Sequence, residues 1–316
     1  MSPVFPWHAA DWDEIGEIAD RGRLGHALLL HGPAGWGKRV FARQIARRLL
    51  GIAVGAADAV EPGVESSDAD LLVHPDARVV TREPAPTSGR LRTQITVDQI
   101  RDLAGFLAQT SGSGGRRVVV LERAEELNVN AANALLKSLE EPGADTHLLL
   151  VSDAPSRTLA TIRSRCQMRA LMPGTDEQAN RWLAERLTTD EVAALLPLAG
   201  GAPLAALELH AADGAELARN VERALEEGRV SELVEMPGRL DPDEQRARAM
   251  RIVDFLYRAL AGRIRGAAGG ASALGDHRLL DRVLSARRML ASTANPNVTL
   301  LLEDLLLPLG RDPRAR

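Results

Sequence analysis

The sequence has very little cysteine, and it has no long apolar run. Cys166 is the only cysteine, which excludes an intrachain disulfide and a zinc site built from several cysteines. No apolar stretch approaches the roughly 18 residues that suggest a membrane span. The first residues also lack the basic start and apolar core of a signal peptide. We therefore expect a globular cytoplasmic protein with no membrane partner.

A surplus of positive charge is also missing. The formal net charge is −4 at pH 7, so no overall positive field attracts the chain to nucleic acid. Any DNA contact must then come from local patches or from partner proteins. Lysine is scarce too: of 39 basic residues only Lys38 and Lys137 are lysines, and both lie in the motifs described below. The chain of 316 residues is long enough for two or three domains with hydrophobic cores.

Residues 116–167 carry the clearest pattern in the chain. Arg117–Leu121 and His147–Val151 are short apolar runs, which predict two buried strands. Between them, apolar residues at i, i+3, i+4 and i+7 predict a helix, Asn130–Glu141, that ends before Pro142. Strand, helix and strand form a βαβ unit, in which the carboxyl ends of the parallel strands lie beside any ligand crevice. The residues at those ends are Glu122, Arg123, Ser152 and Asp153.

A glycine-rich loop follows an earlier predicted strand, His26–His31, and leads into a predicted helix, Arg39–Leu50. This order is typical of a phosphate-binding P-loop, in which backbone N–H groups surround phosphate and a lysine reaches the β and γ oxygens. A loop that only caps the helix remains the alternative. The candidate phosphate-binding residues are Gly32, Gly35, Gly37 and Lys38.

Two positions depart from a hydrolytic P-loop site. Arg39 stands where a serine or threonine hydroxyl normally ligates Mg²⁺, and Arg123 follows Glu122 where an acid normally polarises the attacking water. A guanidinium does neither, so we expect no metal site, at most weak ATP binding and no hydrolysis. Arg39, Arg43 and Arg47 share one face of the predicted helix, which we interpret as a solvated face rather than a phosphate-binding one.

Two further motifs carry a family resemblance. At their spacing, Asn133–Pro142 (NALLKSLEEP) and Ser164-Arg165-Cys166 resemble the signature of bacterial AAA+ clamp-loader subunits. The chain resembles the delta-prime family of the DNA polymerase III clamp loader over most of its length. This resemblance implies an α/β fold in three parts: an AAA+ P-loop domain with a parallel sheet flanked by helices (1–167), a small helical lid (168–211) and an all-α collar for oligomerisation (212–316).

Other patterns add expected elements. The first part should also contain the strand Ala77–Thr81 and the helices Asp13–Asp20 and Val97–Gln109. Thr96 and Gln99 form a capping box at the start of the helix Val97–Gln109. Helical periodicity in the last two parts predicts helices at about Asp176–Arg186, Asp190–Leu198, Pro203–Ala211, Ala215–Glu227, Pro242–Gly266, Asp276–Ser292 and Asn297–Leu309. The apolar segment Leu300–Leu309 must bury itself, either in its own bundle or in a neighbouring chain.

The resemblance also implies a function. Relatives assemble into a hetero-pentamer with delta and the ATP-hydrolysing gamma or tau subunits, and the complex loads the sliding clamp onto primed DNA. Arg165, flanked by Ser164 and Cys166, would be an arginine finger for the neighbouring subunit's nucleotide. Active relatives have a lid arginine where this chain has Leu204. Relatives also commonly carry four zinc-binding cysteines that are missing here, so we expect no zinc and no required cofactor.

Alternatives stay open both for the function of the whole chain and for the role of Arg165. An ATP-hydrolysing gamma- or tau-type subunit, or a related motor, would need the Mg²⁺ hydroxyl, the acidic pair and the lid arginine, all of which are absent or altered. A small-molecule P-loop kinase would explain neither the Ser164-Arg165-Cys166 motif nor the long helical C-terminal part. For Arg165 itself, the alternative to a finger is an ion pair with an acid at the edge of its own domain.

Overall fold

The structure is a computed structural model that describes residues 4–54, 69–85, 89, 91–109, 112, 115–211, 216–217, 219–221, 223, 233–234, 242–266, 271–291 and 296–306. The chain divides into two compact units, residues 1–188 with 201–208, and residues 189–200 with 209–316. The expected division into core, lid and collar stays a prediction.

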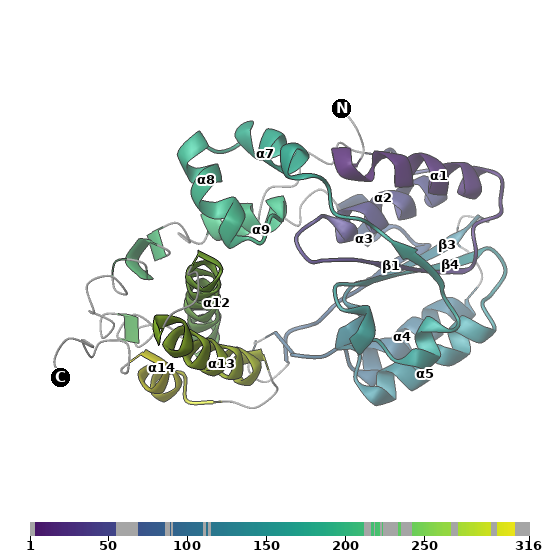
Figure 1. Ribbon diagram of the computed structural model, residues 1–316. Helices are drawn as coiled ribbons and strands as arrows, with labels where there is room; N and C mark the ends of the chain where they lie inside the picture. Colours follow the sequence, from purple (N-terminus) through teal and green to yellow (C-terminus); the bar gives the residue numbers. More distant parts are fainter. Residues whose placement is uncertain are drawn as a thin grey trace. The chain divides into compact units, whose positions relative to one another are not determined.

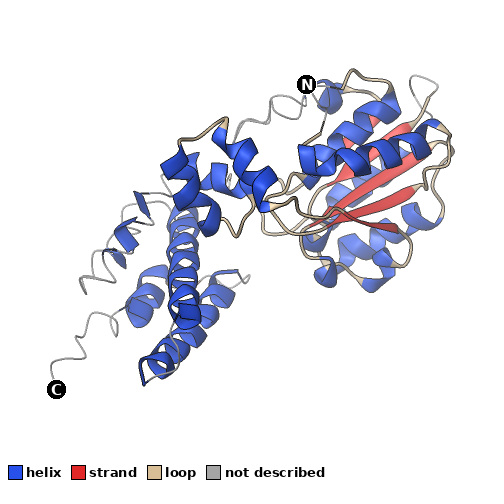
Figure 2. Cartoon of the chain, turned by 45° about the horizontal axis from the view of Figure 1, so that its top comes forward, coloured by secondary structure: helices blue, strands red, loops and turns tan. Residues whose placement is uncertain are grey.

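The first unit is built on a five-stranded parallel sheet with the strand order β2-β3-β4-β1-β5. The strands are β1 (Ala27–His31), β2 (Ala77–Val80), β3 (Arg117–Leu121), β4 (Thr146–Ser152) and β5 (Gln167–Ala170). The central strands are buried on both faces, which explains why their sequences are continuous apolar runs rather than alternating ones. Figure 2 shows helices on both sides of this sheet.

Each face of the sheet has its own hydrophobic core. Helices α1 (Ala9–Asp20), α2 (Lys38–Leu50) and α3 (Ala69–Val73) lie over one face, and α4 (Val97–Ala108) and α5 (Val129–Glu140) lie over the other (Figure 1). Successive strand residues alternate between the two cores, as the pleat requires. The short helix α6 (Ala160–Arg163) leads from this core to β5, and α7 (Asp176–Ala184) follows the sheet.

The ends of α4 illustrate how local sequence sets the element boundaries. At its start, the Gln99 side-chain oxygen accepts a hydrogen bond from the Thr96 N–H at 3.0 Å, as the capping-box pattern predicts. At its end, the buried Arg117 guanidinium donates to the carbonyls of Phe106 (2.7 Å), Leu107 (3.2 Å) and Gln109. Arg117, the first residue of β3, therefore caps the C-terminal end of α4.

Within its described residues the second unit contains helices and connecting turns but no strand. It contains α8 (Thr189–Leu198), the last residues of α9 (Pro203–Ala211), α12 (Pro242–Gly266), α13 (Ala271–Ala291) and α14 (Val298–Leu306). The expected burial of the last apolar segment is confirmed for Leu302, Leu305 and Leu306, which join the core of this unit. Leu300 instead faces solvent. Most of the predicted helix over 215–227 and the end of the segment beyond 306 lie outside the described residues.

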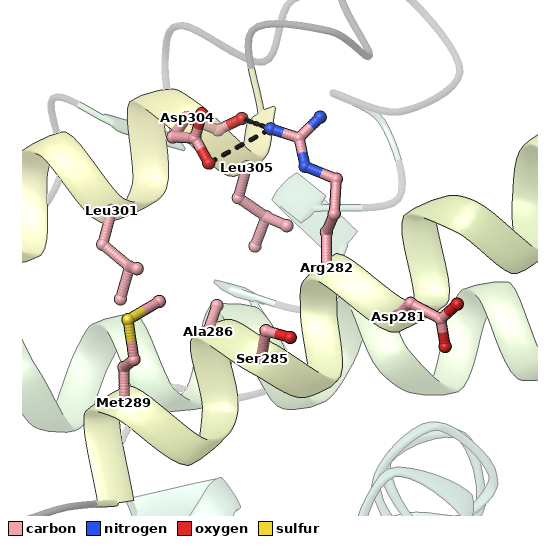
Figure 3. Close-up of a pocket in the computed structure, with 8 residues that line it drawn as sticks. All are labelled: Asp281, Arg282, Ser285, Ala286, Met289, Leu301, Asp304 and Leu305. Carbon is pink, nitrogen blue, oxygen red and sulfur yellow. Dashed lines mark hydrogen bonds and ion pairs between the residues drawn. The ribbon is translucent and has the colours of Figure 1, made fainter.

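A small groove of about 200 Å³ lies between α13 and α14 (Figure 3). At one end the Arg282 guanidinium binds the carbonyl and the carboxylate of Asp304, the latter at 3.2 Å. At the other end Met289 faces Leu301 (Figure 3). The groove thus combines one ion pair with apolar packing between two helices.

Candidate functional site

The glycine-rich loop joins β1 to α2 at the carboxyl edge of the sheet. Gly35 and Gly37 have φ angles of +78° and +85°, in the left-handed region that favours glycine. Gly37 is the N-cap of α2, and Lys38 is the first residue of that helix. The predicted order of strand, loop and helix is therefore confirmed, with a helix start one residue earlier than predicted.

Lys38 is buried and already has an anionic partner. Its Nζ lies 2.5 Å from Oδ1 of Asp153, which follows β4, and donates to the Pro33 carbonyl at 2.6 Å. The Lys38 side chain is 2% exposed and that of Asp153 22%. A nucleotide phosphate at Lys38 would have to displace this carboxylate, so the residues as they stand do not fit a bound triphosphate.

The chain's own side chains cover the loop. The backbone N–H of Leu204 donates to the Gly35 carbonyl at 3.1 Å. A Cβ added at Gly35 would lie 2.9 Å from the Cβ atoms of Ala202 and Ala205. Leu204 and the Phe5 ring also pack against Gly37. The residue that replaces the lid arginine therefore contacts the loop through apolar packing and a backbone hydrogen bond.

An aromatic N-terminal segment adds to this cover. Phe5 stacks on Trp7 with ring centroids 5.1 Å apart, and the Trp7 indole N–H donates to the Trp36 carbonyl at 2.8 Å. His8 is fully buried beside these rings. Burial, and secondarily the charge of Lys38, lowers the pKa of His8 to about 4, so the imidazole is neutral at pH 7. No sequence motif pointed to this segment.

The acid after β3 is also paired internally. Glu122 is 2% exposed, and its Oε1 accepts from Nε of Arg43 on α2 at 2.7 Å. A second guanidinium nitrogen of Arg43 lies 2.7 Å from the same oxygen. A guanidinium thus neutralises the carboxylate that would hold Mg²⁺ in a hydrolytic site. Arg43 completes this site, although the sequence did not assign it there.

The interpretation of Arg39, Arg43 and Arg47 as a solvated face is wrong for two of the three. Arg39 is exposed, but Arg43 is half-buried and Arg47 is buried, donating to the Ala53 carbonyl at 3.1 Å. The physical reason is the helical repeat of 3.6 residues. Steps of four residues drift by about 40° each, so the row turns from solvent toward the sheet.

The other polar residues at this edge are also satisfied within the chain. Arg123 adopts a left-handed conformation, with φ of +56°, and binds Glu126 at 2.9 Å. The hydroxyl groups of Ser152 and Thr158 lie 3.3 Å apart, and the Ser152 oxygen accepts from the N–H of Ala154 at 3.2 Å. The residues predicted at the strand ends therefore lie at the ends of neighbouring strands, but each of them binds another residue of the chain.

Arg165 lies on a different part of the surface, in the turn between α6 and β5. Its Nε and one terminal nitrogen bind Oε1 of Glu140, at 2.7 and 2.5 Å. The other terminal nitrogen donates to the Thr161 carbonyl at 3.0 Å and to the Ser164 hydroxyl at 3.3 Å. The guanidinium is partly exposed. In this chain alone it forms an ion pair with an acid of its own domain, which was the alternative to an arginine finger.

Cys166 faces inward beside Arg165. It is 9% exposed and belongs to the core that α5 and α6 share. Burial raises the pKa of the thiol to about 11, so it stays protonated at pH 7. A protonated, buried thiol behaves as a small apolar residue rather than a nucleophile.

In the part of the chain that the structure describes, no group of three or more His, Cys, Asp or Glu residues is placed to hold a metal ion. His74, in the turn before β2, accepts a hydrogen bond from the backbone N–H of Asp76 at 3.1 Å. The expected lack of zinc stays a prediction, because residues such as 55–68 lie outside the described part of the chain.

Comparisons with known proteins identify the family. The family model described as DNA polymerase III, delta subunit, matches residues 7–174. The DNA polymerase III subunit delta' of Pseudomonas aeruginosa is 47% identical over 217 residues, which are 66% of this chain and 62% of that protein. The same subunit of Escherichia coli K12 is 31% identical over 96% of this chain and 94% of its own length.

A solved structure supports the fold. The DNA polymerase III gamma subunit-related protein of Thermotoga maritima matches 94% of this chain and 98% of its own with a TM-score of 0.52 at 17% identity. Within the described residues no single helix is long and apolar enough to cross a membrane, and α8 with α9 would reach that composition only as a bent pair. The fold and the relatives agree with the family that the motifs suggested. The chain belongs to the family of DNA polymerase III delta-prime subunits.

Proposed function

We propose that this chain acts as a delta-prime subunit of a clamp loader that does not hydrolyse ATP and supplies Arg165 to the ATPase site of a neighbouring subunit. Family membership supports the subunit assignment. The observation that carries the non-hydrolysing role is the internal pairing of Lys38 with Asp153 and of Glu122 with Arg43. The two groups that would bind phosphate and Mg²⁺ are each neutralised by another residue of the chain.

The Lys38–Asp153 ion pair opposes the binding of a nucleotide phosphate at Lys38. Breaking a buried ion pair costs about 3–5 kcal/mol, because an uncompensated charge is left behind. Because the Asp153 side chain is 22% exposed and can recruit water, a ligand that displaces it from Lys38 must offset about 2–3 kcal/mol, which weakens the binding of that ligand by about 30- to 150-fold. No observation favours the alternative of an ATP-hydrolysing gamma- or tau-type subunit. We infer that the chain needs no cofactor of its own.

The proposal for Arg165 rests on its chemistry and its position. A guanidinium stays charged, binds two phosphate oxygens at once and lies here at a partly exposed turn. Arginine fingers supplied by a second protein accelerate phosphoryl transfer by on the order of 10³ to 10⁵. In the proposed hetero-pentamer, delta and gamma or tau subunits are the direct partners, and the sliding clamp and primed DNA are reached through the complex. The proposed location is the cytoplasm.

The test is reconstitution with purified delta, gamma or tau, sliding clamp and primed DNA. We expect the chain to co-elute with the subunits as one large complex in gel filtration. In that complex Arg165→Ala should leave assembly intact and lower the clamp- and DNA-stimulated ATP hydrolysis and clamp loading. Arg157→Ala, which removes an exposed arginine from a nearby turn, is the control and should change neither. Unchanged hydrolysis in an assembled Arg165→Ala complex would leave the chain only a scaffolding role.

A further inference from the structure

The hydrogen-bonding capacity of Arg165 is mostly used within its own subunit. Four contacts from its three nitrogens go to Glu140, Thr161 and Ser164. Thr161 and Ser164 lie in or beside the same short helix and contribute a carbonyl and a hydroxyl, which carry no charge. Glu140 comes from α5, and among the residues that the structure describes it is the one anion that the guanidinium contacts.

Glu140 occupies an unusual place for an acid, the last residue of α5. The negative end of the helix dipole disfavours a carboxylate there, and a basic residue in the last turn is the favourable choice. The exposed Lys137 fills that favourable role one turn earlier on the same helix. The positive charge of Arg165 compensates the unfavourable interaction between the Glu140 carboxylate and the helix dipole. The contact therefore stabilises Glu140, and we interpret it as a specific ion pair.

We propose that Glu140 is a positioning residue that holds Arg165 in a retracted conformation and competes for it with the phosphate of a neighbouring subunit's nucleotide. This inference rests on the proposed role of Arg165 as a finger. One carboxylate oxygen of Glu140 contacts Nε and one terminal nitrogen of Arg165, which form an edge of the guanidinium that a phosphate would use for a two-point contact. The finger therefore reaches the phosphate only after it leaves the carboxylate.

The pair is weak enough to be broken in every catalytic cycle. The two side chains are 34% and 49% exposed, so water and salt screen their attraction. Exposed ion pairs of this kind shift an equilibrium by about 1.4- to 5-fold. A phosphate that carries more than one negative charge outcompetes such a partner, whereas a buried pair would lock the finger in place.

The experiment compares Glu140→Gln with wild type in the reconstituted complex. Glutamine keeps the size of the side chain and removes its charge. We expect kcat for clamp- and DNA-stimulated ATP hydrolysis to rise by about 1.4- to 5-fold while KM for ATP is unchanged, because a finger acts on the transition state. Glu141→Gln removes the same charge from the next, exposed residue and should leave kcat at the wild-type value. Melting temperatures of the isolated variants and gel filtration of the complexes show that folding and assembly are intact.

A double-mutant cycle ties the effect to the finger. In an Arg165→Ala background, Glu140→Gln should have no further effect on kcat. A fall in kcat, no change, or a rise that persists without Arg165 would each overturn the role of Glu140. These outcomes differ from failure of the proposed function, in which Arg165→Ala by itself leaves hydrolysis unchanged.

Discussion

Replacing Lys38 with methionine tests whether this lysine stabilises the fold or binds nucleotide. Methionine keeps most of the length of the side chain and removes the charge. Asp153 then loses the ammonium group 2.5 Å away, and the Pro33 carbonyl loses its donor at 2.6 Å. If the lysine serves the fold, the variant loses stability in the absence of any nucleotide.

The size of that loss follows from the exposure of the two partners. Removing one member of a fully buried pair costs about 3–5 kcal/mol, but the Asp153 side chain is 22% exposed and can recruit water, so we expect about 2–3 kcal/mol. For a unit of this size, 1 kcal/mol corresponds to about 2–4 °C in melting temperature. The midpoint of thermal unfolding should therefore fall by about 5–10 °C.

The assay is urea and thermal unfolding of purified chains, with and without ATP. Lys137→Met removes the only other lysine, which is exposed on α5, and should change stability by less than about 0.5 kcal/mol. Asp153→Asn in the Lys38→Met background should recover part of the loss, because it removes the unpaired charge. A Lys38→Met variant that is as stable as wild type but loses a stabilisation by ATP would refute the reasoning and indicate a nucleotide-binding P-loop.

Two further outcomes follow from the packing around the loop. The pKa of His8 is lowered from 6.5 to about 4, so the unfolded chain binds the proton first and the free energy of unfolding should fall by about 2 kcal/mol from pH 7 to pH 5. Urea titrations at both pH values check this, and the same fall in His8→Phe would contradict it. Gly35→Ala should cost about 1–3 kcal/mol more than Gly51→Ala, since both have positive φ but only Gly35 is covered by other atoms. Equal losses of stability for Gly35→Ala and Gly51→Ala in thermal unfolding would contradict close packing of Ala202 and Ala205 against Gly35.

The three central strands β1, β3 and β4 could be predicted from the sequence because each is a continuous apolar run. Arg117–Leu121 has the predicted bounds, and β1 and β4 differ from prediction by one residue at each changed end. β5 could not be predicted in this way. Among the described strands it lies at the edge and pairs only with β1, and it is largely exposed, so its sequence (QMRA) carries no apolar signal.

The candidate site was predictable in its positions but not in its pairings. Glycine-rich loops and strand ends are local patterns, and they correctly placed Lys38 and Glu122 at the carboxyl edge of the sheet. Their partners Asp153 and Arg43 are separated from them by 115 and 79 residues along the chain, and only the packing of α2 against the strand ends of the folded sheet brings them together. The same holds for Glu140 and Arg165, which are 25 residues apart and meet where the end of α5 lies beside the turn after α6.

ATP hydrolysis by two reconstituted complexes tests the central claim most directly. One complex carries Arg165→Ala in this chain and the other carries Lys38→Met, and both are first shown by gel filtration to contain every subunit. The account predicts that clamp- and DNA-stimulated hydrolysis falls with Arg165→Ala and stays at the wild-type rate with Lys38→Met. Loss of hydrolysis with Lys38→Met and a wild-type rate with Arg165→Ala would contradict it.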